Sequence, residues 1–144
     1  MFYFVLAFVA GMALTIQVGV NSTLRRGLGD PGMATLVSFL VGTVGLVLFL
    51  LLTRTSLPTR TAVAAVPWWA WLGGLVGAFY VVTTVVVGPR LGSATLLALV
   101  VLGQLLAALV IDHFGWIGFP QHPLSTVRIL GAIMLFGGVL LIVR

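Results

Sequence analysis

Long runs of apolar residues alternate with short polar stretches along the whole chain. The apolar runs cover Tyr3 to Leu24, Met33 to Leu52, Trp68 to Gly88, Leu91 to Ile111 and Leu124 to Val143. Each run is about 20 residues long, which at about 1.5 Å per residue crosses a hydrocarbon core of about 30 Å. The pattern therefore predicts an all-α integral membrane protein, with a single five-helix transmembrane domain over residues 1–144.

The first and last apolar runs differ from the other three at their starts. The amino terminus lacks the basic start and small-residue cleavage site of a secretory signal, so we expect it to be the first retained span. The last run carries Arg128 about one turn inside its start, which leaves 15 uncharged residues from Ile129 to Val143. We expect this arginine to extend to the lipid headgroups, because a guanidinium in hydrocarbon is costly.

Proline positions agree with this division of the chain. The six prolines are Pro31, Pro58, Pro67, Pro89, Pro120 and Pro123. All are expected at span ends or between spans, so that none interrupts a helix. Asp30 and Pro31 have the pattern of an N-cap followed by proline at N1, and Pro67 can open the third helix in the same way. The segment Gly88 to Gly92 is expected to be a short loop between antiparallel helices.

Composition narrows the class of protein. Hydrophobic residues make up 61% of the chain and charged residues 6%, which is typical of a membrane protein. The net charge of +5 comes from scattered single arginines, so nucleic acid is not an expected partner. The absence of cysteine excludes thiol catalysis and thiolate metal sites. No phosphate loop, paired carboxylates or nucleophile with a base is present, so we expect neither an enzyme nor a cofactor.

The arginines give little information about orientation in the membrane. With five spans, the face reached after the first span (face A) receives Arg25, Arg26, Arg90 and Arg144, and the opposite face (face B) receives Arg54, Arg60 and Arg128. Orientation follows the bias in basic residues, and here the difference is one charge. One interpretation is a single orientation set by the first helix. The other is that both orientations are made and combine as an antiparallel homodimer.

Polar side chains also occur deep inside the spans. Gln17 and Asn21 share one side of the first span, Tyr80 lies on the third and Gln104 on the fourth. A lone amide in hydrocarbon costs several kcal/mol, so these groups must face protein or a water-filled cavity. Each one alone could simply join two helices by a hydrogen bond. As a set at similar depth they favour a substrate-binding cavity.

Acidic residues are absent from the span interiors, where a site for a cation or a coupled proton usually has one. A neutral substrate, or one whose charge is met by helix ends or by interfacial arginine, is therefore easier to reconcile with the chain. Asp112 stands at the C-terminal end of its helix and should have a cationic neighbour. Within the chain the candidates are Arg54, Arg60 and Arg128, which share its membrane face. In an antiparallel dimer the partner's Arg25, Arg26, Arg90 and Arg144 would share that face too. The pair is expected to be either a structural ion pair or a gate, with Arg128 and Arg90 as the first choices.

Histidines near Asp112 offer one further possibility. His113 and His122 could be imagined with it as a metal site, but nothing in their spacing fixes a coordination geometry. No metal site is therefore expected, and His113 is better interpreted as a pH-sensitive surface residue.

Several dispersed motifs resemble one family. They are PWWAWLGGLVGAFYV (Pro67 to Val81), GPRLG (Gly88 to Gly92), GQ (Gly103 and Gln104), DHFG (Asp112 to Gly115), QVGVNSTLRRGLGDP (Gln17 to Pro31) and SFLVGT (Ser38 to Thr43). Together they resemble the short, YdcZ-like branch of the drug/metabolite transporter superfamily, over essentially the whole chain. The resemblance implies half of a ten-helix inverted-repeat fold that works as a dimer.

The implied function is transport of a small molecule across the inner membrane, with no substrate identified. The more distant small multidrug resistance proteins use a glutamate in their first helix, whereas Gln17 stands at the comparable depth here. We therefore do not expect their proton and cation exchange. The expected site is a central cavity lined by Gln17, Asn21, Tyr80 and Gln104 in an antiparallel homodimer. The alternatives are a passive channel on the same dimer, or a structural or assembly protein with no permeation pathway.

Overall fold

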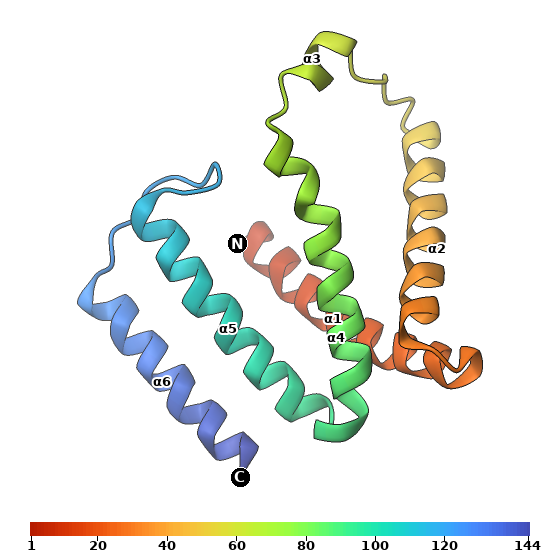
Figure 1. Ribbon diagram of the computed structural model, residues 1–144. Coiled ribbons are helices and arrows are strands. Elements are labelled where there is room, and N and C mark those ends of the chain that lie inside the picture. The colour runs from red at the N-terminus through yellow and green to blue at the C-terminus, as the bar shows by residue number, and fades with distance from the viewer. The chain divides into compact units, whose positions relative to one another are not determined.

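The computed structural model describes residues 1–144 and contains only helices (Figure 1). The elements are α1 (Phe2–Leu28), α2 (Pro31–Leu52), the short α3 (Arg60–Ala64), the 3₁₀ helix η1 (Trp68–Leu72), α4 (Gly73–Leu91), α5 (Ser93–Phe114) and α6 (Thr126–Val143). Five helical stretches, with η1 and α4 counted as one, are long and apolar enough to cross a membrane. The prediction of an all-α protein with five spans is confirmed.

The turn between α1 and α2 is built from local signals. Gly29 has φ 79°, a left-handed conformation that favours glycine, and its N–H donates to the Arg25 carbonyl at 2.8 Å. Asp30 follows, and its side chain accepts the N–H of Met33 at 2.8 Å while Pro31 occupies the first turn of α2. The predicted N-cap and N1 proline are therefore both present.

Pro89 corrects the sequence analysis. It was expected in a loop, but α4 continues through it to Leu91, so that only Gly92, with φ 78°, separates α4 from α5. Proline lacks an N–H and leaves the carbonyl four residues earlier, that of Val85, without its helical donor. Because the proline lies in the last turn, the helix loses one hydrogen bond and still extends to its end. The statement that no proline interrupts a helix was wrong here.

The connection between α2 and α4 contains structure that the hydrophobic pattern did not predict. Thr59 caps α3 by accepting the N–H of Ala62 at 3.2 Å. Pro67 then precedes η1, which runs directly into α4. Pro67 therefore stands directly before the third span, at the N-cap position instead of N1 as expected, and the span begins with a 3₁₀ turn that carries Trp68, Trp69 and Trp71.

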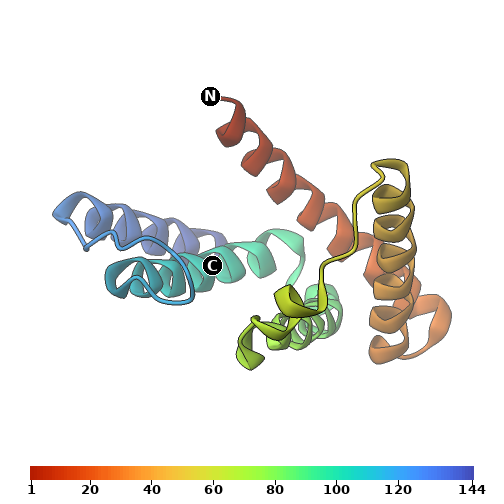
Figure 2. The same cartoon turned by 90° about the horizontal axis from the view of Figure 1, so that it is seen from above.

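Contacts divide the chain into two compact units, Met1–Pro89 and Arg90–Arg144. In the first unit α1 packs against α2. In the second unit α5 and α6 pack along each other, as both Figure 1 and the view from above in Figure 2 show. The single five-helix domain stays a prediction.

Most apolar side chains of the spans are exposed. In each of α1, α2, α5 and α6, only 6% of the most hydrophobic 18-residue stretch is buried. In the span that contains α4 the share is 17%. A soluble protein could not keep so much apolar surface in water. These faces therefore contact lipid or another protein surface.

Candidate functional site

One side of α1 carries three polar residues at four-residue intervals. Gln17, Asn21 and Arg25 lie above one another on this side, which we call the polar side of α1. Asn21 is 3% exposed, Arg25 is half-buried and Gln17 is exposed. Polarity therefore continues from the middle of the span to its face A end.

Arg25 connects the polar side of α1 to α4. Its Nη1 donates to the backbone carbonyl of Val85 at 2.9 Å. This is the carbonyl that Pro89 leaves without a helical donor, and Val85 itself is fully buried, with 0% exposure. A buried carbonyl without a partner costs about 1–3 kcal/mol, so the guanidinium removes a penalty that the proline creates.

The neighbouring stretch of α4 carries the predicted Tyr80. Tyr80 and Thr84 lie one turn apart; Tyr80 is half-buried and Thr84 is 2% exposed. The Thr84 hydroxyl donates to the Val81 carbonyl at 3.0 Å, so this donor is satisfied inside the helix. Gly77, one turn before Val81, faces the ring of Phe39: a methyl group added there would meet the ring at 3.7 Å. The Phe39 side chain of α2 therefore reaches toward Gly77 of α4.

Gln17 and Gln104 are exposed, each near the middle of its span. Neither side chain makes a hydrogen bond within its own unit. Gln17, Asn21 and Tyr80 belong to the first unit and Gln104 belongs to the second. A cavity shared by all four residues therefore stays a prediction.

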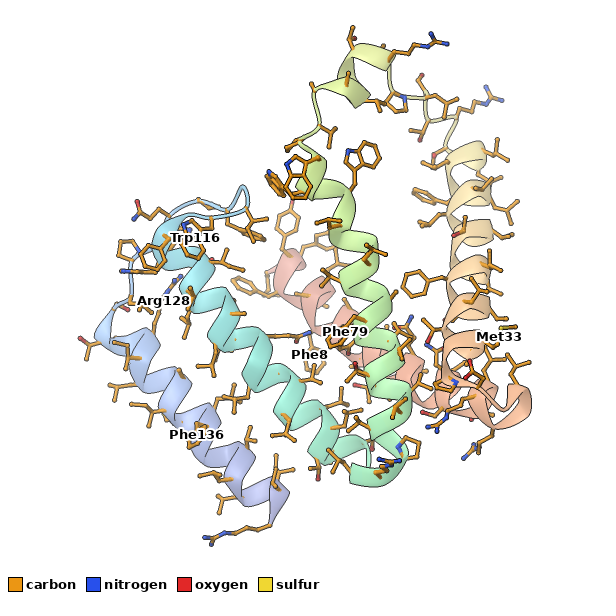
Figure 3. All side chains as sticks on the ribbon, viewed as in Figure 1. Phe8, Met33, Phe79, Trp116, Arg128 and Phe136 are labelled. Atoms are coloured by element: carbon orange, nitrogen blue, oxygen red, sulfur yellow. The ribbon has the colours of Figure 1, made fainter.

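Asp112 and Arg128 meet at the connection between α5 and α6, where Figure 3 labels Arg128. Nη1 of Arg128 lies 3.1 Å from Oδ2 of Asp112 and also donates to the His122 carbonyl at 3.2 Å. The Arg128 side chain is 37% exposed and the Asp112 side chain is 28% exposed. A groove of about 470 Å³ between α5 and α6 is lined by both residues and by Leu105, Ala108 and Leu135. Arg128 is thus the cationic neighbour of Asp112, and a gating role stays a prediction.

Arg90, the other candidate for this pair, is not close to Asp112 within the chain. Arg90 lies in the last turn of α4, just before α5 begins, and Asp112 lies near the far end of α5, which is about 30 Å long at about 1.5 Å per residue. A contact between them would require the Arg90 of a second, inverted copy.

The loop after α5 is held by the end of that helix. The N–H of His122 donates to the Asp112 carbonyl at 2.7 Å, and Nε2 of Gln121 donates to the His113 carbonyl at 3.0 Å. The N–H of Leu124 donates to Nδ1 of His113 at 3.2 Å. The last two of these hydrogen bonds give His113 a structural role in the loop.

Arg25 was not among the site residues predicted from the sequence. Two signals were available: the four-residue spacing from Gln17 through Asn21 to Arg25, and a proline four residues after Val85. The first signal shows that Arg25 continues a polar side. The second identifies a carbonyl in need of a donor, but only the fold shows which side chain supplies it.

A family model and a curated relative both match almost the whole chain. The family model described as "Putative inner membrane exporter, YdcZ" matches residues 2–141. The "Inner membrane protein YdcZ" of Escherichia coli strain K12 is 32% identical over 135 residues, which cover 94% of this chain and 90% of that protein. No solved structure shows a significant match to the chain.

Proposed function

The chain belongs to the YdcZ family of the drug/metabolite transporter superfamily, and on this premise we propose that it is a secondary transporter subunit that works as an antiparallel homodimer. Its family is described as inner membrane exporters, and the chain is a multi-pass protein of the cytoplasmic membrane. The dimer moves a small molecule by alternating access through a central cavity lined by Gln17, Asn21, Tyr80 and Gln104.

The exposed amides of Gln17 and Gln104 are the observation that carries the proposal. Each lies near the middle of a span and makes no hydrogen bond within its unit. Contact with acyl chains would cost several kcal/mol for each amide. A water-filled cavity between two copies removes this cost, and it also provides the polar groups that a substrate needs for orientation.

A further surface suited to helix packing lies along α1, on the side away from Gln17 and Asn21 and therefore outside the proposed cavity. On the side opposite Arg25, the small residues Gly19, Thr23 and Gly27 form a shallow trough that is open to the surroundings. The Thr23 hydroxyl donates to the Gly19 carbonyl at 3.1 Å, so the trough leaves this donor satisfied. Helices in membranes approach closely along such small residues, because packing and not hydrophobicity drives their association.

The near-equal distribution of arginine between the two faces supports inverted copies. Four arginines on face A against three on face B give the inserting chain little preference. In an inverted pair the inward-open and outward-open states are related by symmetry and are nearly equal in energy. Direction then comes from gradients, and a substrate shifts the balance only by its differential affinity for the two states.

Transport is tested on purified protein in liposomes, with compounds chosen by a thermal-shift screen of metabolites. A transporter gives flux that saturates with concentration and is accelerated by substrate on the opposite side. Flux that rises linearly without counter-transport identifies a passive channel. The Gln104→Leu variant should lose transport while the dimer stays intact, and Gln104→Asn should retain part of it. Loss of the dimer with Gln104→Leu would instead support a structural protein whose amides only join helices.

A further inference from the structure

We propose that Arg25 binds the anionic group of the transported molecule, so that the substrate is a small organic anion with a carboxylate or a phosphate. This inference rests on the proposed transport function and deepens it. Three features of Arg25 support it: its charge has no acidic partner, most of its donors remain free, and it lies at the end of the polar side of α1.

The charge of Arg25 has no acidic partner. The chain contains two acidic residues: Asp112 pairs with Arg128, and Asp30 caps α2 through the Met33 N–H. Arg25 donates instead to a neutral carbonyl, that of Val85, and remains half-buried. A partly buried guanidinium without a counter-ion attracts oxyanions, because it has lost part of its hydration and its charge is not neutralised.

The geometry leaves most of the guanidinium available. A guanidinium has five N–H donors, and one Nη1 bond to Val85 fixes its position without using the others. Carboxylate and phosphate oxygens match the remaining fork of donors. The bond to Val85 therefore orients the group, and the remaining donors can bind a ligand.

Arg25 also lies on the proposed route. Gln17 and Asn21 precede it on the same side of α1, so neutral amides lead from the middle of the span to the cation. In an antiparallel homodimer one Arg25 stands near each membrane face. An anion entering from either side would then meet an equivalent guanidinium, supplied by one copy or the other.

Arg25 has a structural role as well, so a test must separate the two roles. Replacement of Pro89 by alanine returns an N–H to position 89 and gives the Val85 carbonyl its helical donor. In the Pro89→Ala background, Arg25 is no longer needed to satisfy this carbonyl. The double variant Arg25→Gln with Pro89→Ala therefore removes the cation while helix α4 keeps its hydrogen bonds.

Binding is measured by thermal shift and calorimetry on the full chain, purified without phospholipid in an uncharged detergent at constant ionic strength. The oxyanion probes are inorganic phosphate, acetate and succinate; succinamide is the neutral probe and putrescine the cationic probe. At least one oxyanion should bind to the unaltered chain, to Pro89→Ala and to Arg26→Gln. Arg26 is the matched control, because it is exposed and donates only to Thr23, at 2.9 Å. In the double variant the affinity should fall by about tenfold or more.

Three results would overturn the proposal: no oxyanion binds to the unaltered chain, the double variant binds oxyanions as well as Pro89→Ala does, or phosphatidylglycerol protects the protein while no soluble oxyanion does. The last result would assign Arg25 to a lipid headgroup. Because binding is measured without transport, anion binding without flux would contradict the transporter proposal alone. Saturable flux of a cation without anion binding would contradict the present inference alone.

Discussion

Arg25 in the first unit and Arg128 in the second are both half-buried, but their partners differ in charge. Arg128 lies 3.1 Å from the carboxylate of Asp112, whereas Arg25 donates to the neutral carbonyl of Val85. The first arrangement neutralises its charge within the chain. The second fixes a guanidinium in place and leaves its charge available. The comparison shows that a partner atom at hydrogen-bond distance is not the same as a counter-ion.

The largest effect is expected from Arg25→Ala. The buried Val85 carbonyl would lose its donor, and the free energy of unfolding should fall by about 1–3 kcal/mol. Denaturant titration of the purified protein measures this change. Addition of Pro89→Ala to Arg25→Ala should recover most of the loss, because alanine donates to the same carbonyl. An equal loss in the exposed control Arg26→Ala would show that the bond to Val85 is unimportant.

The two membrane faces are compared by removing one arginine from each. Arg26→Gln leaves three basic residues on either face, whereas Arg60→Gln leaves four on face A and two on face B. If one charge near the surface is worth about 1 kcal/mol, each change should shift the ratio of orientations about fivefold. The shifts should have opposite directions. Reporters active on only one side of the membrane, fused to the C-terminus, measure the ratio.

If the reporters find the C-terminus of the unaltered chain on only one side of the membrane, the main support for inverted copies is lost. Equal shifts in the same direction from both variants would show that the arginines do not determine orientation.

A smaller effect is expected from Asp112→Asn. The ion pair with Arg128 is 28% and 37% exposed on its two sides, so solvent screens it and its loss should cost about 0.2–1 kcal/mol of unfolding free energy. The cost should shrink further at high salt. Thermal unfolding at low and at high salt measures the loss of stability and its dependence on salt. If the variant abolishes saturable flux without loss of stability, the pair acts as a gate; unchanged flux would make it purely structural.

The smallest effect is expected at His113, which holds the loop before α6. His113→Leu removes the acceptor for the Leu124 N–H and should cost about 0.5 kcal/mol, the lower end of the range for a net hydrogen bond. His113→Asn can place an amide oxygen near the same point and should cost less. Hydrogen exchange at the Leu124 amide reports the bond directly. Equal exchange in both variants would contradict the assignment.

Some parts of the fold and the site were predictable because their causes are local. Five apolar runs must become helices in lipid, since no other open structure satisfies the backbone there. Asp30 and Pro31 identified the start of α2, because a capping bond reaches only three residues. The depth of Gln17 and Gln104 also follows directly from their place in the runs.

Other parts could not be predicted because their causes are distant in sequence. Pro89 was expected in a loop, since nothing nearby in the sequence replaces the missing hydrogen bond. The donor is Arg25, which lies 60 positions before Val85. Similarly, several arginines were possible partners for Asp112. The loop that returns through His122 to α6 selects Arg128.

The amino-acid sequence by itself determined the membrane class, the five spans and the near balance of arginine between faces, because each depends on how apolarity and charge are ordered along the chain. Only the tertiary structure decided which arginine is neutralised and which is not. That outcome depends on distances of a few ångströms between residues of different helices, and no pattern along a single helix encodes them.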